Sequence, residues 1–257
     1  MNKLKGTPTS FDVIGDIAIL EIPEEHIKNE KAIAEQFLKD HKNIKVVAKK
    51  VGIHSGKYRT QNLKIIAGEK RKTTLHKENG IRMELNVETS YFSPRSSTER
   101  ARIAGLVKPK EEVLVMFSGV APFPLVLAKY SKPKVIYAIE INPKAHEFAE
   151  KNVKLNKFDN IKLYLGDVKE VLPKLKKKFD RIVMPLPKTA EEFLPDAKKY
   201  AKKGATIHFY TFGQEKEFKE IKKTIKKVFP KVKTIKLVKC GKYAPYTFRV
   251  CAEFKAP

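Results

Sequence analysis

The sequence contains only two cysteines, Cys240 and Cys251, and no tryptophan. Two cysteines cannot build the disulfide framework of a small secreted protein, and neither they nor the six histidines show a CxxC or HxxxH spacing. We therefore expect a cytoplasmic protein without a structural metal. No run of about 18 apolar residues occurs, so a membrane span is not expected. Residues 1–10 lack the apolar segment of a signal peptide.

Acidic residues are scarce beside basic ones, with 29 Asp and Glu against 54 Lys and Arg and a net charge of +25. Arginine is scarce as well, since only 8 of the 54 basic residues are Arg. A lysine excess of this kind has two open explanations: the charged surface of a thermophile's protein, or a polyanionic partner whose phosphates the lysines neutralise. The 42% hydrophobic content is sufficient for a buried core, which excludes a wholly disordered chain.

The length of 257 residues predicts two domains, the first of them small. Residues 1–88 have irregular β-rich patterning: a strand, turn and strand within 11–22, and a helix-period apolar stripe within 24–41. Three further short strands are expected at residues 46–51, 63–66 and 81–87. The sequence therefore predicts a small α+β domain, followed by a polar stretch at 93–98 and a helix from about 98 to 107.

Residues 89–257 change to a regular alternation of apolar strands with helices, which is typical of an α/β doubly wound sheet. Two strands without a helix between them end the chain and are expected to form an antiparallel hairpin. The sequence predicts a Rossmann-like domain. The expected strands are 113–117, 135–139, 162–165, 181–184, 206–211, 234–239 and 247–254. The expected helices are 122–130, 143–155, 190–202 and 214–229, with a short helix after the third strand that ends at residue 176.

The loop after the first of these strands, MFSGVAPF, indicates the kind of ligand. It has neither the GxGxxG of a dinucleotide site nor the GK[ST] of a P-loop, so a ligand without a pyrophosphate is favoured. Glu140 ends the second strand, where an acid can accept both ribose hydroxyls, and Asp167 ends the third, where it can receive an adenine amino group. With Gly119, these residues predict S-adenosyl-L-methionine (AdoMet) as the cofactor.

Several long segments carry a resemblance to a known family: SFDVIGDIAILEIPEE, HKENG, YFSPRSSTERARIA, MFSGVAPF, YAIEINP, RIVMPLPK and GATIHFYTFG. Together they resemble the archaeal tRNA methyltransferases that methylate N1 of the guanosine 3′ of the anticodon, position 37, a family that includes wyosine-pathway members. The resemblance implies a class I Rossmann-like methyltransferase domain preceded by a small α+β RNA-binding domain. Longer members also carry an N-terminal domain that grips the tRNA elbow, which this chain is expected to lack.

The resemblance also implies roles for individual residues. Glu99 matches the general base that removes the N1 proton, and Arg59 matches an arginine of the small domain that reaches the target base. Arg95 and Arg100 match residues that hold the tRNA or orient the base, and Tyr91 is expected to pack against the nucleotide. From the residues alone, Glu99 would instead be an ordinary carboxylate of a first helical turn, and the arginines would be surface ion-pair partners.

The loop after the fourth strand departs from the family, in which it commonly reads Asn-Leu-Pro. Pro185 replaces the Asn and offers neither a side-chain donor nor a backbone N–H. Pro185 and Pro187 are expected at the catalytic site and Lys188 at the tRNA. The cofactor is expected to contact Phe117, Gly119, Val120, Pro122, Glu140, Ile141, Asp167 and Val168.

The expected function is therefore AdoMet-dependent methylation of guanosine 37 at N1, by a monomer acting on the tRNA anticodon stem-loop. Because of Pro185, C7 methylation of 4-demethylwyosine at the same position, alone or in addition, stays open. A non-catalytic tRNA-binding protein of the same fold is the third possibility. It predicts loss of the base and of the cofactor contacts, whereas Glu99, Glu140 and Asp167 are all present.

Overall fold

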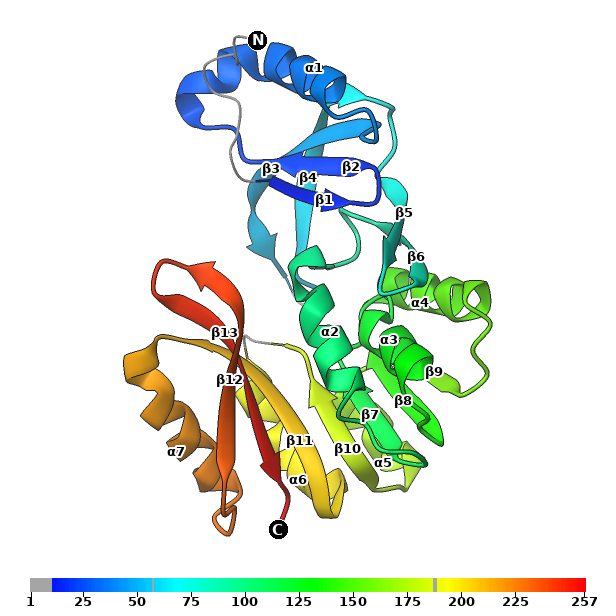
Figure 1. The fold of residues 1–257 in the computed structure, drawn as a ribbon, viewed down its shortest axis with the longest axis vertical. Coiled ribbons are helices and arrows are strands. Elements are labelled where there is room, and N and C mark those ends of the chain that lie inside the picture. The colour runs from blue at the N-terminus through cyan, green and yellow to red at the C-terminus, as the bar shows by residue number, and fades with distance from the viewer. Residues whose placement is uncertain (1–10, 57, 187–188) are drawn as a thin grey trace. The chain divides into compact units, whose positions relative to one another are not determined.

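The structure is a computed structural model that describes residues 11–56, 58–186 and 189–257 (Figure 1). Contacts between Cα atoms divide the chain into two compact units, of which the first ends at Pro94 and the second spans Arg95–Pro257. This division falls six residues after the boundary at residue 88 that the sequence predicts. No helix among the described residues is long and apolar enough to cross a membrane.

The N-terminal unit contains a four-stranded sheet with the order β1-β2-β3-β4, and β5 and β6 form a separate antiparallel hairpin. Within the sheet, β2 and β3 are parallel and the other pairs are antiparallel. Helix α1 buries Ile33, Ala34 and Phe37, and Ala34 and Phe37 join the apolar cluster of this sheet. The elements are β1 (Phe11–Ile14), β2 (Ile17–Leu20), a 3-10 turn (Glu24–Asn29), α1 (Glu30–Asp40), β3 (Val46–Ser55), β4 (Thr60–Gly68), β5 (Thr73–Glu78) and β6 (Ile81–Asn86).

The turn between β1 and β2 requires a glycine. Gly15 has a φ of +59°, and a Cβ atom at this position would lie 2.1 Å from Thr74 Oγ1. The close approach lets the Gly15 backbone N–H donate a hydrogen bond to His76 Nδ1 at 3.0 Å. The first hairpin and the β5–β6 hairpin are thereby joined inside the same unit.

The C-terminal unit is a seven-stranded sheet with the order β12-β13-β11-β10-β7-β8-β9. Strands β11, β10, β7, β8 and β9 are parallel, and β13 and β12 add an antiparallel hairpin at one edge. The strands are β7 (Glu112–Met116), β8 (Val135–Glu140), β9 (Ile161–Leu165), β10 (Phe179–Met184), β11 (Ala201–Gly213), β12 (Ile235–Ala244) and β13 (Thr247–Lys255). The helices are α2 (Ser97–Ala104), α3 (Pro122–Tyr130), α4 (Pro143–Leu155), α5 (Val168–Leu175), α6 (Leu194–Tyr200) and α7 (Phe218–Val228), with 3-10 turns at Pro94–Ser96, Ala190–Phe193 and Glu215–Glu217.

The two faces of the C-terminal sheet differ in chemistry. One face packs against α5, α6 and α7 in a single apolar cluster that includes Ile207 and Phe209 of β11 and Ala252 of β13. Because side chains alternate along a strand, His208 and Tyr210 point to the opposite face, where α2 and α3 pack against each other (Figure 1). This second face carries the polar groups considered below.

The structure confirms the α/β class, the Rossmann-like sheet and the terminal antiparallel hairpin. Two of the differences from the sequence-based elements have a clear physical reason. Strand β5 was not expected, because Thr73–Glu78 has only one apolar residue, Leu75, and that residue is exposed. The helix expected at 190–202 begins as a 3-10 turn and ends at Tyr200, because Ala201 already pairs with Phe179 of β10.

Candidate active site

The loop that follows β7 has an unusual backbone. Phe117, Gly119 and Ala121 all have positive φ angles, of 57°, 58° and 71°. A left-handed conformation is costly for a residue with a Cβ atom, and such conformations are found mainly at functional sites. Ala121 is also the N-cap of α3, and Pro122 takes the first helical position, which suits proline because its missing N–H would have no partner there. Four of the expected cofactor contacts, Phe117, Gly119, Val120 and Pro122, therefore lie on this loop and the helix start.

Glu140 ends β8 and joins the loops around it. Its side chain is buried, with Oε2 accepting the Gly119 backbone N–H at 2.6 Å and Oε1 accepting the Asn142 N–H at 2.8 Å. Burial raises the pKa of the Glu140 carboxyl, against the backbone donors Asn142, Gly119 and Ile141, which favour the charged form. A carboxylate offers about four lone-pair positions, so at least one acceptor position remains for a ribose hydroxyl.

Asp167 and Val168 mark the start of α5, beside the end of β9. The Asp167 side chain caps this helix by accepting the Lys169 backbone N–H at 2.9 Å, and Val168 is buried. Gly166, directly before them, donates its N–H to the Glu140 carbonyl at 2.8 Å. The hydrogen bonds of Glu140 therefore connect the loops after three neighbouring strands, at the carboxyl edge where ligands of such sheets bind.

These residues fit AdoMet. Ser118 Oγ is buried and has no hydrogen-bond partner among the described residues, so a polar group in this loop is left for a ligand. The Glu140 carboxylate suits ribose hydroxyls, and Asp167 adds a second acceptor at the start of α5. Asp167 caps α5 through its side chain, and its contact with the adenine amino group stays a prediction.

Glu99 lies in the first turn of α2, as the sequence predicts, and is only 5% exposed. Its two oxygens accept a forked pair of hydrogen bonds from Arg102, Nε to Oε2 and Nη2 to Oε1, both at 2.7 Å. Tyr210 of β11 donates its hydroxyl to Oε1 at 2.6 Å. Arg95, Arg100 and Arg102 all lie close to Glu99 in the sequence. Arg102, one helical turn further on, is the arginine that holds it.

The other residues expected to bind tRNA have varied surroundings. Arg95 lies in the 3-10 turn before α2, whereas Arg100 is buried, with 3% of its surface exposed. Pro185 follows β10, and the Leu186 backbone N–H donates to the Met184 carbonyl at 2.8 Å. Pro187 and Lys188 lie outside the described residues.

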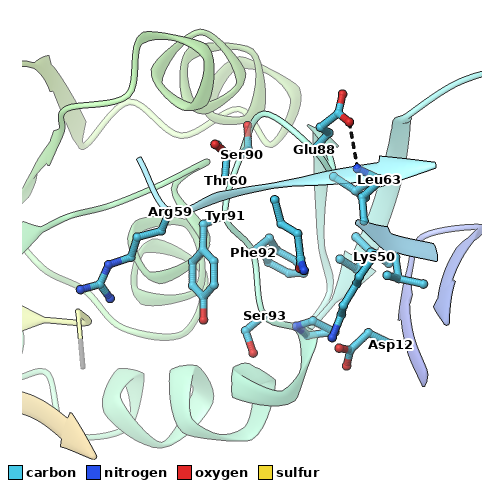
Figure 2. A pocket seen from close by; sticks show the side chains of 15 residues that line it. Asp12, Lys50, Arg59, Thr60, Leu63, Glu88, Ser90, Tyr91, Phe92 and Ser93 are labelled. Carbon is cyan, nitrogen blue, oxygen red and sulfur yellow. Dashed lines mark hydrogen bonds between the residues drawn. The ribbon is translucent and has the colours of Figure 1, made fainter. Parts of the chain in front are cut away.

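Arg59 and Tyr91 line a pocket within the N-terminal unit (Figure 2). Their side chains lie alongside one another at its edge, and burial lowers the pKa of the Arg59 guanidinium while the nearby Tyr91 raises it. Arg59 has a φ of +53°, a strained conformation for a residue with a side chain. Ser90 also lines the pocket, and its buried Oγ has no hydrogen-bond partner among the described residues. The pocket is therefore lined by a cation, an aromatic ring and a hydroxyl, groups that suit a polar planar ligand.

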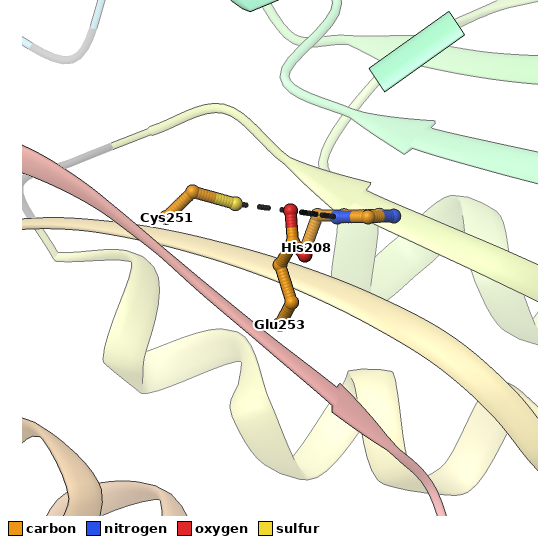
Figure 3. Close-up of side chains that lie close together, drawn as sticks. All are labelled: His208, Cys251 and Glu253. Carbon is orange, nitrogen blue, oxygen red and sulfur yellow. Dashed lines mark hydrogen bonds and ion pairs between the residues drawn. The ribbon is translucent and has the colours of Figure 1, made fainter. Parts of the chain in front are cut away.

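A cluster that the sequence did not predict lies between β11 and β13. Potential ligand atoms of His208, Cys251 and Glu253 lie within 4.8 Å of one another (Figure 3). Two guanidinium groups contact the same residues: Arg181 Nη1 lies 2.6 Å from His208 Nε2, and Arg102 forms an ion pair with Glu253. Fixed positive charges so close to the ligand atoms disfavour a cation, so we assign the cluster to the protein's own hydrogen bonding.

The parallel sheet and the ligand-binding edge formed by the loops after β7, β8 and β9 define a class I AdoMet-dependent methyltransferase domain. Residues 74–238 match the TRM5/TYW2 methyltransferase domain, and residues 1–72 match the TYW2 N-terminal domain. The chain belongs to the TRM5/TYW2 family.

Two relatives illustrate the range of activities in this family. The tRNA (guanine(37)-N(1))-methyltransferase Trm5b of Pyrococcus abyssi is 42% identical over 253 residues, covering 96% of this chain and 75% of the relative. The tRNA (guanine(37)-N(1))/4-demethylwyosine(37)-methyltransferase Taw22 of Nanoarchaeum equitans is 34% identical, covering 88% of this chain and 92% of the relative.

Solved structures of similar proteins contain tRNA or a cofactor fragment. A complex of aTrm5 with tRNALeu has a TM-score of 0.89 at 37% identity, covering 98% of this chain and 73% of that one. Trm5 of Methanocaldococcus jannaschii in complex with adenosine has a TM-score of 0.84 at 37% identity, with the same coverage. Together with the site geometry, the family establishes AdoMet as the cofactor and tRNA as the substrate class.

Proposed function

We propose that this protein methylates N1 of the guanosine 3′ of the tRNA anticodon, at position 37, with AdoMet as methyl donor. The observation that carries the proposal is Glu99, a buried carboxylate that neighbouring side chains hold in one orientation. It lies in the same unit as the loops around Glu140. The activity printed for the Trm5b relative supports the same substrate and the same atom.

The chemistry requires a base because N1 of guanine carries a proton at neutral pH. Bound AdoMet supplies an electrophilic methyl group. Glu99 accepts the N1 proton, while the Glu140 carboxylate accepts the ribose hydroxyls of the cofactor and the Asp167 carboxylate its adenine amino group. Arg59 stabilises the negative charge that develops on guanine O6 as the proton leaves.

We assign the pocket of the N-terminal unit to the nucleotide. Tyr91 is 41% exposed, so its ring is accessible for stacking against a base. We assign the positive charges of Arg95 and Lys188 to the tRNA phosphates. We assign the buried Arg100 to orienting the target base. The protein acts as a cytoplasmic monomer on the anticodon stem-loop and needs no metal.

A second candidate is C7 methylation of 4-demethylwyosine, and the loop after β10 is the observation that favours it. Pro185 has no N–H, and the N–H of Leu186 is already bonded to the Met184 carbonyl. Neither Pro185 nor Leu186 therefore presents a free backbone donor to a base. The Taw22 relative, whose name includes both reactions, shows that members of the family combine them.

Mass analysis of anticodon-loop nucleosides tests the proposal. The protein is incubated with AdoMet and tRNA that carries either guanosine or 4-demethylwyosine at position 37, and a tRNA with adenosine there is the control. We expect 1-methylguanosine from the first substrate and no product from the control. Methylation of 4-demethylwyosine alone would overturn the guanosine proposal in favour of the second candidate.

A further inference from the structure

A line of buried polar side chains crosses the α2 face of the C-terminal sheet and ends at Glu99. Two pairs of neighbouring residues on β11 and β13 start it: His208 lies opposite Glu253, and Tyr210 lies opposite Cys251. All four side chains point away from the apolar cluster beneath the sheet. Polar groups are rarely buried without partners, so each of them is expected to have a defined role.

The hydrogen bonds determine the orientation of His208. A guanidinium only donates, so Nε2 of His208 must accept from Arg181, and the ring proton must be on Nδ1. This proton faces Glu253 Oε1, at 3.6 Å from Nδ1. Burial lowers the pKa of His208, which keeps the ring neutral. Glu111 in turn holds Arg181 through two hydrogen bonds, of 2.7 and 3.1 Å.

Arg102 is shared between two carboxylates. Its Nη1 forms an ion pair with Glu253, and its Nε and Nη2 hold Glu99. The single positive charge of Arg102 therefore lies between the negative charges of Glu99 and Glu253. The three side chains together keep one net negative charge. Burial raises the pKa of Glu253, but the contacts with His208 and Arg102 outweigh it and hold that pKa at about 2. Glu253 therefore keeps its negative charge beside Arg102.

Tyr210 is the third donor to Glu99, after the two N–H groups of Arg102, and one acceptor position remains on the carboxylate. Burial raises the pKa of Tyr210 well above its usual value, and the negative charge of Glu99 adds to this, so the hydroxyl stays protonated and donates. Among the described residues, Oε1 accepts from Tyr210 and Arg102, whereas Oε2 accepts from Arg102 alone. Each carboxylate oxygen has two lone pairs, so the remaining position is on Oε2.

Two thiols also lie near Glu99. Cys251 on β13 and Cys240 on β12 are each close enough for Glu99 to raise their pKa values, in addition to the larger effect of burial. The pKa of Cys240 reaches about 12. Both thiols therefore stay neutral and do not compete for the proton.

We propose that Arg102 and Tyr210 are positioning residues for Glu99, that Glu253 fixes Arg102, and that Oε2 of Glu99 is the atom that receives the N1 proton. This rests on the proposed function. In the step concerned, the N1–H bond of guanine breaks, its electron pair stays on N1, and the proton passes to Oε2. The guanidinium of Arg102 orients the Glu99 carboxylate. Because Glu253 shares this guanidinium, the negative charge of Glu99 is not fully neutralised.

The test measures single-turnover methyl transfer against pH, at saturating AdoMet and tRNA, for Tyr210→Phe and Arg102→Lys. Tyr210→Phe removes one donor to the charged carboxylate, so the acidic limb of the profile should move to higher pH by about one unit. Arg102→Lys keeps the charge but loses the planar fork, so the plateau rate should fall about 10- to 100-fold. Unchanged AdoMet affinity and circular dichroism would show that both variants are folded.

Lys177→Gln is the matched control, because Lys177 forms an ion pair with Glu112 at 2.6 Å in the same unit and does not contact Glu99. It should keep the wild-type profile. Wild-type profiles for both Tyr210→Phe and Arg102→Lys, while Glu99→Gln is inactive, would overturn the positioning proposal and leave the proposed function intact. A fully active Glu99→Gln would instead overturn the base assignment on which the proposal depends.

Discussion

The backbone N–H of Gly119 donates a hydrogen bond of 2.6 Å to Oε2 of Glu140. The two residues are 21 positions apart and follow neighbouring parallel strands, β7 and β8. Gly119 has a φ of +58°, in the left-handed region that glycine enters readily, so the turn itself is one that this residue favours. The carboxylate thus shapes the cofactor loop and is also the expected acceptor for the ribose.

Replacing Glu140 should weaken AdoMet binding. Glu140→Gln puts an amide NH2 opposite one of two backbone N–H groups, which loses a hydrogen bond and sets two donors against each other. We expect the Kd for AdoMet, measured by titration calorimetry, to rise at least about tenfold. Glu147→Gln is the control, since Glu147 is exposed on α4 and pairs only with Lys144. An unchanged Kd for Glu140→Gln would exclude the ribose role.

Replacing Glu99 by Gln should abolish most of the catalysis and preserve binding. The amide keeps the size of the side chain and removes its basicity. General-base contributions are about 10²- to 10⁴-fold, so single-turnover methyl transfer to guanosine tRNA should slow by about that factor. The acidic limb of the pH–rate profile should disappear as well. A variant as fast as the wild type would show that Glu99 is not the base and would favour methylation of the wyosine carbon, where proton removal can follow methyl transfer.

Binding of tRNA should depend steeply on salt, because a protein with a net charge of +25 releases counterions when it neutralises phosphates. If about six to ten phosphates are contacted, the affinity should fall roughly 10³- to 10⁵-fold between about 50 and about 200 mM salt. Filter binding over this range measures the slope. A tRNA affinity that does not change with salt would favour the other explanation of the lysine excess, the charged surface of a thermophile's protein.

Two arginine variants separate phosphate contacts from base contacts. Arg95→Gln should reduce the steepness of log affinity plotted against log salt concentration by about one, since a phosphate contact accounts for roughly one released counterion. Arg59→Gln should weaken binding without changing the slope, because we assign Arg59 to the base. The opposite pattern would reverse the two assignments.

Glu253 should contribute to the acid stability of the fold. Its pKa is held at about 2, below the usual glutamate value of 4.5, so its stabilising effect is complete above about pH 4.5 and is lost as the pH falls toward about 2. A shift of this size corresponds to at most about 3 kcal/mol of unfolding free energy. Urea denaturation at several pH values should show a smaller loss over this range for Glu253→Gln than for the wild type.

The control for this measurement is Glu220→Gln, at an exposed pair with Lys223 on α7. Exposed ion pairs contribute little to stability, so its pH dependence should match that of the wild type. If Glu253→Gln also matched the wild type, the Arg102 and His208 contacts would not stabilise the charged carboxylate in solution.

Much of the architecture is determined by local patterns in the sequence. Parallel strands that are buried on both faces are continuous apolar runs, and all six residues of β8 are buried. Pro122 and Pro143 mark helix starts, and the bounds of α3 and α4 agree with those predicted. Glu140 was identifiable for the same reason, because the last residue of a parallel strand must lie at the ligand-binding edge of the sheet.

Except for Arg102 on the same helix, the partners of Glu99 were decided only by the tertiary structure. Tyr210 is 111 residues away along the chain, and Glu253 reaches Glu99 only through Arg102. The alternation of polar and apolar residues in IHFY and VCAEF indicates that one face of these strands is polar, but neither the pairing of β11 with β13 nor the packing of α2 over them is a local property. Strand register and helix packing together place one guanidinium between two carboxylates, and that arrangement sets which oxygen of Glu99 stays available for a proton.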